Sequence, residues 1–104
     1  MKLYPMTPAL ARREYELEYQ DSVTAVVLVV GTPALFSDAP NGDWYCPWTI
    51  QAPHKSWQHY AGGVDELQAL LLAVSAIRVE LEQLAKIGKL SWLGSENLGL
   101  DLIS

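Results

Sequence analysis

The chain has 104 residues, of which half are apolar and 18% are charged, and its formal net charge at pH 7 is −5. This length and balance are typical of a single globular domain, residues 1–104, and exclude a disordered chain. The seven basic residues are scattered and form no stripe that would neutralise successive phosphates. We therefore expect no nucleic-acid partner, and a basic protein suits this chain better.

The sequence predicts neither a membrane span nor a secretory signal. Its longest apolar run, residues 25–30, is far shorter than the roughly 20 residues that cross a bilayer. No apolar signal core follows the N-terminal residues, and Pro8 interrupts the stretch. The single cysteine excludes an internal disulfide and suits a reducing compartment. These features predict a cytoplasmic protein without a membrane partner.

An irregular lead-in, residues 1–11, precedes two predicted strands that form a hairpin. Residues 13–20 alternate strictly, with aromatic and aliphatic side chains on one face and glutamates on the other. The glutamates are Glu14, Glu16 and Glu18. Residues 23–30 are β-branched or apolar on both faces. This second strand is therefore predicted to be central and buried on both sides.

Three further strands are predicted. Residues 44–50 follow a long loop and place their larger apolar side chains on one face. Pro47 cannot donate to a sheet ladder, so this strand is expected at a sheet edge or beside a bulge. Residues 56–61 are expected to form the fourth strand, and residues 89–93 a short fifth strand.

A helix from Asp65 to about Lys86 is the most sharply marked element of the sequence. Asp65 is the predicted N-cap, and Gln68 completes a capping-box pattern. Gly88 is expected at the C′ position that ends the helix. Apolar side chains recur at steps of three and four, which predicts one buried stripe. The stripe is Leu67, Leu70, Val74, Ile77, Leu81 and Leu84.

The first half of this helix is apolar beyond the stripe. Leu71 and Leu72 point away from it and need cover from another layer. The cover is expected from the N-terminal segment or the C-terminal tail of the same chain, or else from a second subunit. Leu71 and Leu72 are therefore the candidate residues for self-association.

Strands in a run followed by one long helix predict an α+β fold. In this fold, an antiparallel meander of four to five strands packs on the helix of the C-terminal half. A wound α/β sheet would need further helices between the strands, and the sequence supplies only one.

The order of motifs resembles a family of small uncharacterised bacterial proteins. In that family an aromatic-Cys-Pro-aromatic strand precedes a Gly-x-Asp-x-Leu-Gln-Ala-Leu helix, a short strand and a Leu-Gly ending. The matching segments are residues 44–48, 63–70, 90–92 and 97–100. The resemblance implies a shared fold and carries no established activity. Small acidic domains of this organisation also resemble immunity or antidote proteins.

Few residues are suited to catalysis. Cys46 with His54 and His59 is the one set that would supply a nucleophile and a base. Cys46 lies between tryptophans on a predicted apolar face, where burial lowers the reactivity of a thiol. A metal site would join these residues to Asp43, but their spacing matches no zinc pattern. We therefore expect no catalytic residue, no metal ion, no cofactor and no enzyme.

Two surface features are candidates for binding a partner. The three glutamates of the first strand either serve solubility and protect the strand from edge pairing, or dock a basic partner. The aromatic residues Tyr45, Trp57 and Tyr60 either form a second core layer or anchor a partner from the sheet face away from the helix.

The first functional hypothesis is a non-enzymatic protein-binding module whose acidic, aromatic sheet face holds another protein. Its most concrete form is an immunity-type protein that occludes a basic toxin. The alternative is a small homodimer formed through Leu71 and Leu72, which in one form encloses a small-molecule pocket.

Overall fold

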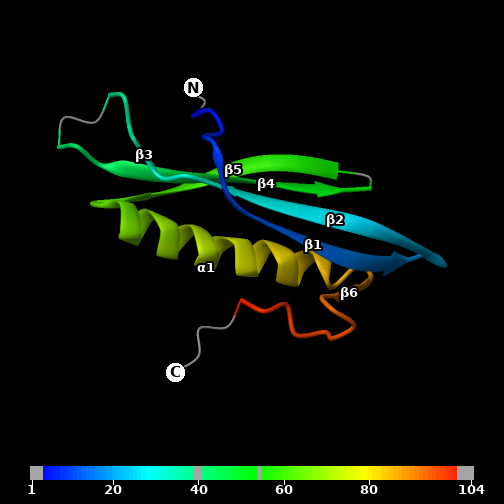
Figure 1. The fold of residues 1–104 in the computed structure, drawn as a ribbon. Coiled ribbons are helices and arrows are strands. Elements are labelled where there is room, and N and C mark those ends of the chain that lie inside the picture. Colours follow the sequence, from blue (N-terminus) through cyan, green and yellow to red (C-terminus); the bar gives the residue numbers. More distant parts are fainter. Residues whose placement is uncertain (1–3, 39–40, 54, 101–104) are drawn as a thin grey trace.

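The computed structural model describes residues 4–38, 41–53 and 55–100. These residues form six strands and one helix (Figure 1). In chain order the elements are β1 (Ala9–Tyr19), β2 (Ser22–Gly31), β3 (Ala34–Leu35), β4 (Trp44–Ala52), β5 (Lys55–Gly63), α1 (Glu66–Leu84) and β6 (Lys89–Ser91).

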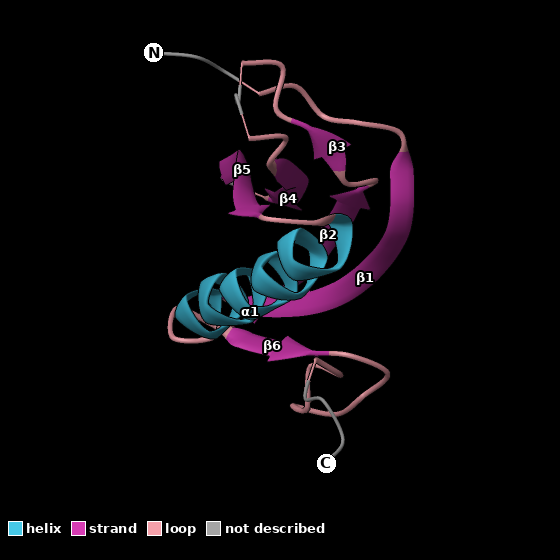
Figure 2. Cartoon of the chain, turned by 90° about the vertical axis from the view of Figure 1, so that its left-hand side faces the viewer, coloured by secondary structure: helices cyan, strands magenta, loops and turns pink. Residues whose placement is uncertain are grey.

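The strands form one antiparallel sheet, and the predicted α+β fold is confirmed. Strands β1, β2, β4 and β5 are neighbours in that order, as a meander requires. The two-residue strand β3 continues along the edge of β4 that β2 occupies. Strand β6 returns after the helix and pairs with the other side of β1. Figures 1 and 2 both show α1 on one face of the sheet.

Strand β4 is an interior strand, so the prediction of an edge position for it is wrong. Its pairing passes from Val30 opposite Trp48 to Ala34 opposite Tyr45. Pro47 therefore lies opposite the break between β2 and β3, where a ladder donor is not needed. Pro47 was predicted at a sheet edge or beside a bulge, and it lies beside an interruption of the pairing instead of at an edge.

The core lies between α1 and the helix-facing side of the sheet. The residues of β1 and β4 that were predicted to share this face are buried or, at Tyr19 and Trp44, partly buried there. Tyr15, Cys46 and Ile50 are fully enclosed. The outer face is largely uncovered. Val27 and Val29 are only half-buried there, so the prediction that β2 is buried on both sides is wrong. No second layer of the described chain packs over them.

The buried stripe of α1 differs from the predicted one in its first half. Ala69 and Ala73 are fully buried against the sheet, whereas Leu67 is 62% exposed. The alanines let the start of α1 lie close to β5, because a Cβ on Gly63 would lie 2.5 Å from the Ala69 backbone nitrogen. The second half follows the prediction, with Ile77, Leu81 and Leu84 buried.

The start of α1 is as predicted and its end is not. The backbone N–H of Gln68 donates to the Asp65 carboxylate at 2.7 Å, and the Gln68 side chain accepts from Val64 N–H. The helix ends at Leu84 rather than near Lys86. Gly88 allows close packing instead of a C′ cap, because a Cβ there would lie 2.5 Å from the Glu18 carbonyl oxygen. Within the described residues, no helix has the length and apolar character to span a bilayer.

Arg13 of β1 holds the Leu-Gly ending, Leu98 and Gly99, through hydrogen bonds. The Arg13 guanidinium stacks over the Trp92 ring at 3.8 Å and donates to the carbonyls of Leu98 and Gly99. Gly99 has a φ of +70°, and a Cβ there would collide with Trp92. The segment that follows brings Leu100 to the flank of α1. This motif therefore has a structural role in holding the tail on the helix side.

Candidate functional site

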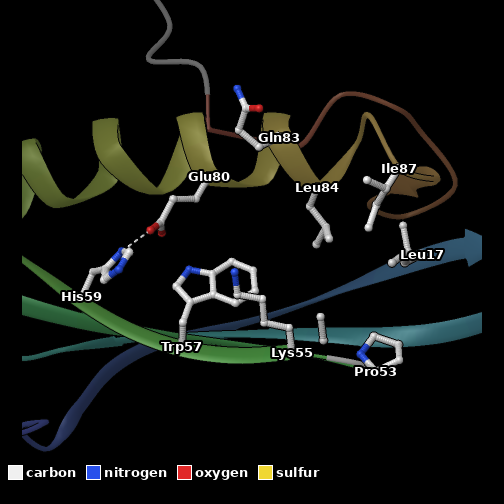
Figure 3. A pocket seen from close by; sticks show the side chains of 10 residues that line it. Leu17, Pro53, Lys55, Trp57, His59, Glu80, Gln83, Leu84 and Ile87 are labelled. Carbon is white, nitrogen blue, oxygen red and sulfur yellow. Dashed lines mark hydrogen bonds and ion pairs between the residues drawn. The ribbon is translucent and has the colours of Figure 1, made fainter.

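A cleft of about 450 Å³ opens between the second half of α1 and the far end of the β4–β5 hairpin (Figure 3). The register explains its position. Pairing between β2 and β4 stops at Val27 opposite Gln51, and the hairpin turns back at Ala52, while β1 and β2 continue beyond it. The second half of α1 lies over this end of the hairpin, and the turn after the helix brings Ile87 close to Leu17 of β1 (Figure 3). Leu17, Ala52, Leu84 and Ile87 give the cleft its apolar walls.

Strand β5 contributes a row of three side chains to this cleft. Trp57 pairs with Ile50 across the sheet and His59 pairs with Trp48, which places both on the helix-facing side. Lys55 follows the same alternation at the start of the strand. Trp57 is half-buried and lies in the middle of the row (Figure 3).

Glu80 is the carboxylate at the inner end of the cleft. Its side chain is only 18% exposed. Its Oε2 accepts a hydrogen bond from Trp48 Nε1 at 2.6 Å, and its Oε1 accepts from His59 Nδ1 (Figure 3). Both oxygens are therefore engaged by protein donors, as a buried carboxylate requires. Figure 3 shows Glu80 reaching from α1 toward the His59 ring on β5.

The Glu80 contact fixes the proton position and orientation of His59. A carboxylate accepts only, so His59 Nδ1 carries a proton in this contact. The side chain is 59% exposed, and no hydrogen bond from a described residue engages Nε2. In the neutral ring Nε2 accepts a hydrogen bond, and in the charged ring it donates one.

Lys55 completes the polar groups on the strand side of the cleft. Its Nζ lies 5.6 Å from the centre of the Trp57 ring, within the range of a cation–π contact. Among the described residues no carboxylate forms an ion pair with this amine. Gln83 borders the cleft from the helix, and its exposed side chain points away from β5 (Figure 3).

A family model described as Domain of unknown function (DUF6968) matches residues 11–102. The chain belongs to the DUF6968 family. No curated protein and no solved structure matches it. The prediction of an uncharacterised family is confirmed at this level, and the immunity-type resemblance remains a prediction.

The predicted acidic, aromatic surface of this DUF6968 chain is divided between the two faces of the sheet. Glu14, Glu16 and Glu18 are exposed on the outer face, as predicted. Trp57 lies on the other face, within the cleft. The alternation of β5 would have placed Trp57 correctly, because Trp57 and Tyr60 are three positions apart and therefore lie on opposite faces of the strand.

The outer-face glutamates have basic neighbours. Glu14 lies 3.6 Å from Arg12 in an exposed ion pair, and Glu18 is opposite Lys89 in the register of β1 and β6. Exposed pairs of this kind contribute little to stability. They do reduce the net negative charge that the face offers to a basic partner.

Tyr45 and Tyr60 share an aromatic cluster on the outer face. Tyr4 packs against both rings, with centroid distances of 5.2 Å and 5.0 Å, and Phe36 joins the cluster. Tyr45 is 5% exposed beneath this cover, and its hydroxyl donates to the Pro5 carbonyl. Tyr60 remains partly exposed. The interpretation as a second core layer thus describes Tyr45, whereas Tyr60 presents its ring to solvent.

Leu71 and Leu72 are 46% and 47% exposed on the outer side of α1. Leu100 of the C-terminal segment approaches Leu71 from one flank. The expected cover by the same chain is therefore only partial among the described residues.

Cys46 has the setting of a buried structural residue. Its thiol is buried and donates to the Gly31 carbonyl at a sulfur–oxygen distance of 3.4 Å. Burial raises the pKa of this thiol to about 11, so it stays protonated at neutral pH. His54 lies outside the described residues, and the described His, Cys, Asp and Glu residues form no cluster that would hold a metal ion.

The raised pKa of Cys46 gives a testable pH dependence. The folded pKa of about 11 exceeds the usual value of 9.0, so the unfolded chain loses the thiol proton first. The free energy of unfolding should therefore fall as pH rises between these two values. Denaturant titrations should show that the free energy of unfolding falls more steeply with pH in the wild type than in Cys46→Ala. The comparison removes the contribution of tyrosine ionisation, because both proteins contain the same tyrosines. Equal slopes in the two proteins would contradict the burial of a protonated thiol.

Proposed function

We propose that this domain is a non-enzymatic binding module that holds a small, largely apolar organic molecule in the cleft between α1 and β5. The observation that supports the proposal is the cleft with Trp57 at its centre. Its volume of about 450 Å³ is within the usual range for small-molecule sites, about 300–1,000 Å³. Apolar walls with a few convergent polar groups are typical of such sites.

Binding is a better explanation of these residues than catalysis. His59, oriented by Glu80, has the geometry of a general base. The described residues that line the cleft include no hydroxyl or thiol that this base would activate. Cys46 is buried and protonated instead.

A ligand-observed NMR screen of a diverse fragment library tests the proposal. We expect hits whose affinity falls roughly tenfold in Trp57→Ala, because the ring supplies the main apolar contact. Leu71→Ala, on the outer side of α1, is the matched control and should leave the affinity unchanged. A library without hits, or hits indifferent to Trp57→Ala, would refute the proposal.

A second candidate function is binding of a basic protein, in the manner of an immunity protein, on the outer face of the sheet. It is favoured by three exposed glutamates beside the half-buried Val27 and Val29. Capture from producing cells should then return a stoichiometric partner that Glu16→Lys abolishes. A partner retained by Glu16→Lys would count against this face.

Self-association through the outer side of α1 is supported by the exposure of Leu71 and Leu72. Sedimentation should then show a dimer that Leu71→Asp dissociates. A strict monomer at tens of micromolar would remove this candidate.

A further inference from the structure

The available polar groups of the cleft, Lys55 and His59, lie beside the Trp57 ring. Lys55, Trp57 and His59 alternate along β5 and share one face. Successive side chains on one face of a strand are about 7 Å apart. In Figure 3, His59 and Lys55 leave β5 on opposite sides of Trp57, and the Lys55 side chain reaches back toward the ring. A molecule lying along the ring therefore meets the Lys55 amine beside the ring and the His59 ring at one end.

The negative groups around the cleft are already occupied. Both Glu80 oxygens accept hydrogen bonds, from Trp48 and His59. The end of α1 also borders the cleft, and its carbonyls would favour a cation if they were free. Three of these carbonyls accept hydrogen bonds from backbone N–H groups that follow the helix. Ala85 N–H donates to the Leu81 carbonyl, Lys86 N–H to that of Gln83, and Ile87 N–H to that of Leu84.

The charge left for a ligand is that of Lys55. This amine contacts the face of Trp57, and no ion pair in the described part of the chain neutralises it. An anionic group placed beside Trp57 would therefore gain a charge-assisted hydrogen bond. A cationic ligand would instead compete with Lys55 for the same ring.

We propose that the ligand of this cleft is an elongated apolar acid, with its carboxylate at Lys55 and its apolar body along Trp57, between β5 and α1. The inference rests on the proposed function and names its ligand class. Leu84 and Ile87 cover the apolar body from the helix side. His59 Nε2 hydrogen-bonds a polar substituent at the far end.

Three probes of one shape but different charge test this inference. They are 4-phenylbutanoate, its neutral primary amide and 4-phenylbutylamine, titrated at low salt by NMR. We expect the acid to bind up to about fivefold tighter than the amide, because one exposed ion pair is worth about 0.2–1 kcal/mol. Lys55→Gln should abolish this preference and leave the affinity for the amide unchanged. Lys89→Gln removes the same charge from β6, away from the cleft, and should preserve it.

Several outcomes would overturn the acid as ligand. Equal affinities for acid and amide would remove Lys55 from recognition, and tighter binding of the amine would show that the field of Glu80 prevails. If none of the three binds while other fragments depend on Trp57, the ligand class is wrong and the binding function stands. If no fragment depends on Trp57, the binding function itself is wrong.

Discussion

Ile77→Ala is expected to lower the free energy of unfolding by about 2–5 kcal/mol. Ile77 is fully buried in the layer between α1 and the sheet, beside the core cluster that Trp48 and Ile50 form. Removing three carbons from a packed site costs the transfer free energy of those atoms and the free energy of the cavity that remains. Chemical denaturation monitored by circular dichroism measures the change.

Leu67→Ala is the matched control, because the periodicity of the sequence placed Leu67 and Ile77 on one stripe. Leu67 is 62% exposed, so its truncation should change the free energy of unfolding by no more than about 0.5 kcal/mol. Similar losses of stability at both positions would contradict the packing of α1 on the sheet through Ala69 and Ala73.

Glu80→Ala is expected to lower the free energy of unfolding by about 1–3 kcal/mol, the cost of a buried donor without an acceptor. The donor is Trp48 Nε1, which bonds to Glu80 at 2.6 Å, and Trp48 itself is 2% exposed. His59 loses its orienting partner in the same variant. Thermal or chemical unfolding measures the loss, and the indole N–H resonance of Trp48 should shift upfield.

Two further variants separate the role of Glu80 from a general effect of charge. Glu80→Gln keeps an oxygen for Trp48 and should recover part of the stability. Glu82→Ala removes an exposed carboxylate that pairs with Arg78 one turn away, which is worth only about 0.3–0.5 kcal/mol. Losses of equal size in Glu80→Ala and Glu82→Ala would contradict the buried acceptor.

The sequence predicts the strands well where one face is wet. The alternation from Glu14 to Tyr19 defines both faces of β1, because each exposed glutamate is followed by a residue whose side chain points to the core. It predicts β2 less well, because valines on both faces look doubly buried. Whether a second layer exists depends on where distant segments go, and here the N-terminal segment covers Tyr45 and leaves Val27 half-exposed.

The helix face illustrates why periodicity alone is insufficient. Stripes through Leu67 and through Ala69 both have helical spacing, and hydrophobicity favours the leucine. The structure buries the alanine stripe, and the start of α1 packs closely on Gly63 at the end of β5. Glu80 offered a usable signal, because the steps from Ala73 to Ile77 and from Ile77 to Glu80 are four and three residues and place all three on one helix face. A carboxylate at a stripe position indicates a buried, hydrogen-bonded acid, and this carboxylate helps to define the cleft.

The cleft itself was not predictable from local patterns. It exists because β4 and β5 turn back before β1 and β2 end, and this is a property of strand register. Trp57 was assigned to the outer face together with Tyr60. Residues 57 and 60 have opposite parity, so the alternation of a single strand separates them.

The central claim is that a ligand binds beside Trp57, and the side-chain N–H resonances of the four tryptophans test it most directly. A fragment hit is titrated into ¹⁵N-labelled protein, with the Trp57 resonance assigned from Trp57→Phe. We expect the largest shift at Trp57, a smaller one at Trp48 through Glu80, and none at Trp92, which stacks on Arg13 at the far edge of β1. A largest shift at Trp92, or shifts confined to backbone amides of β1 and β2, would contradict the account.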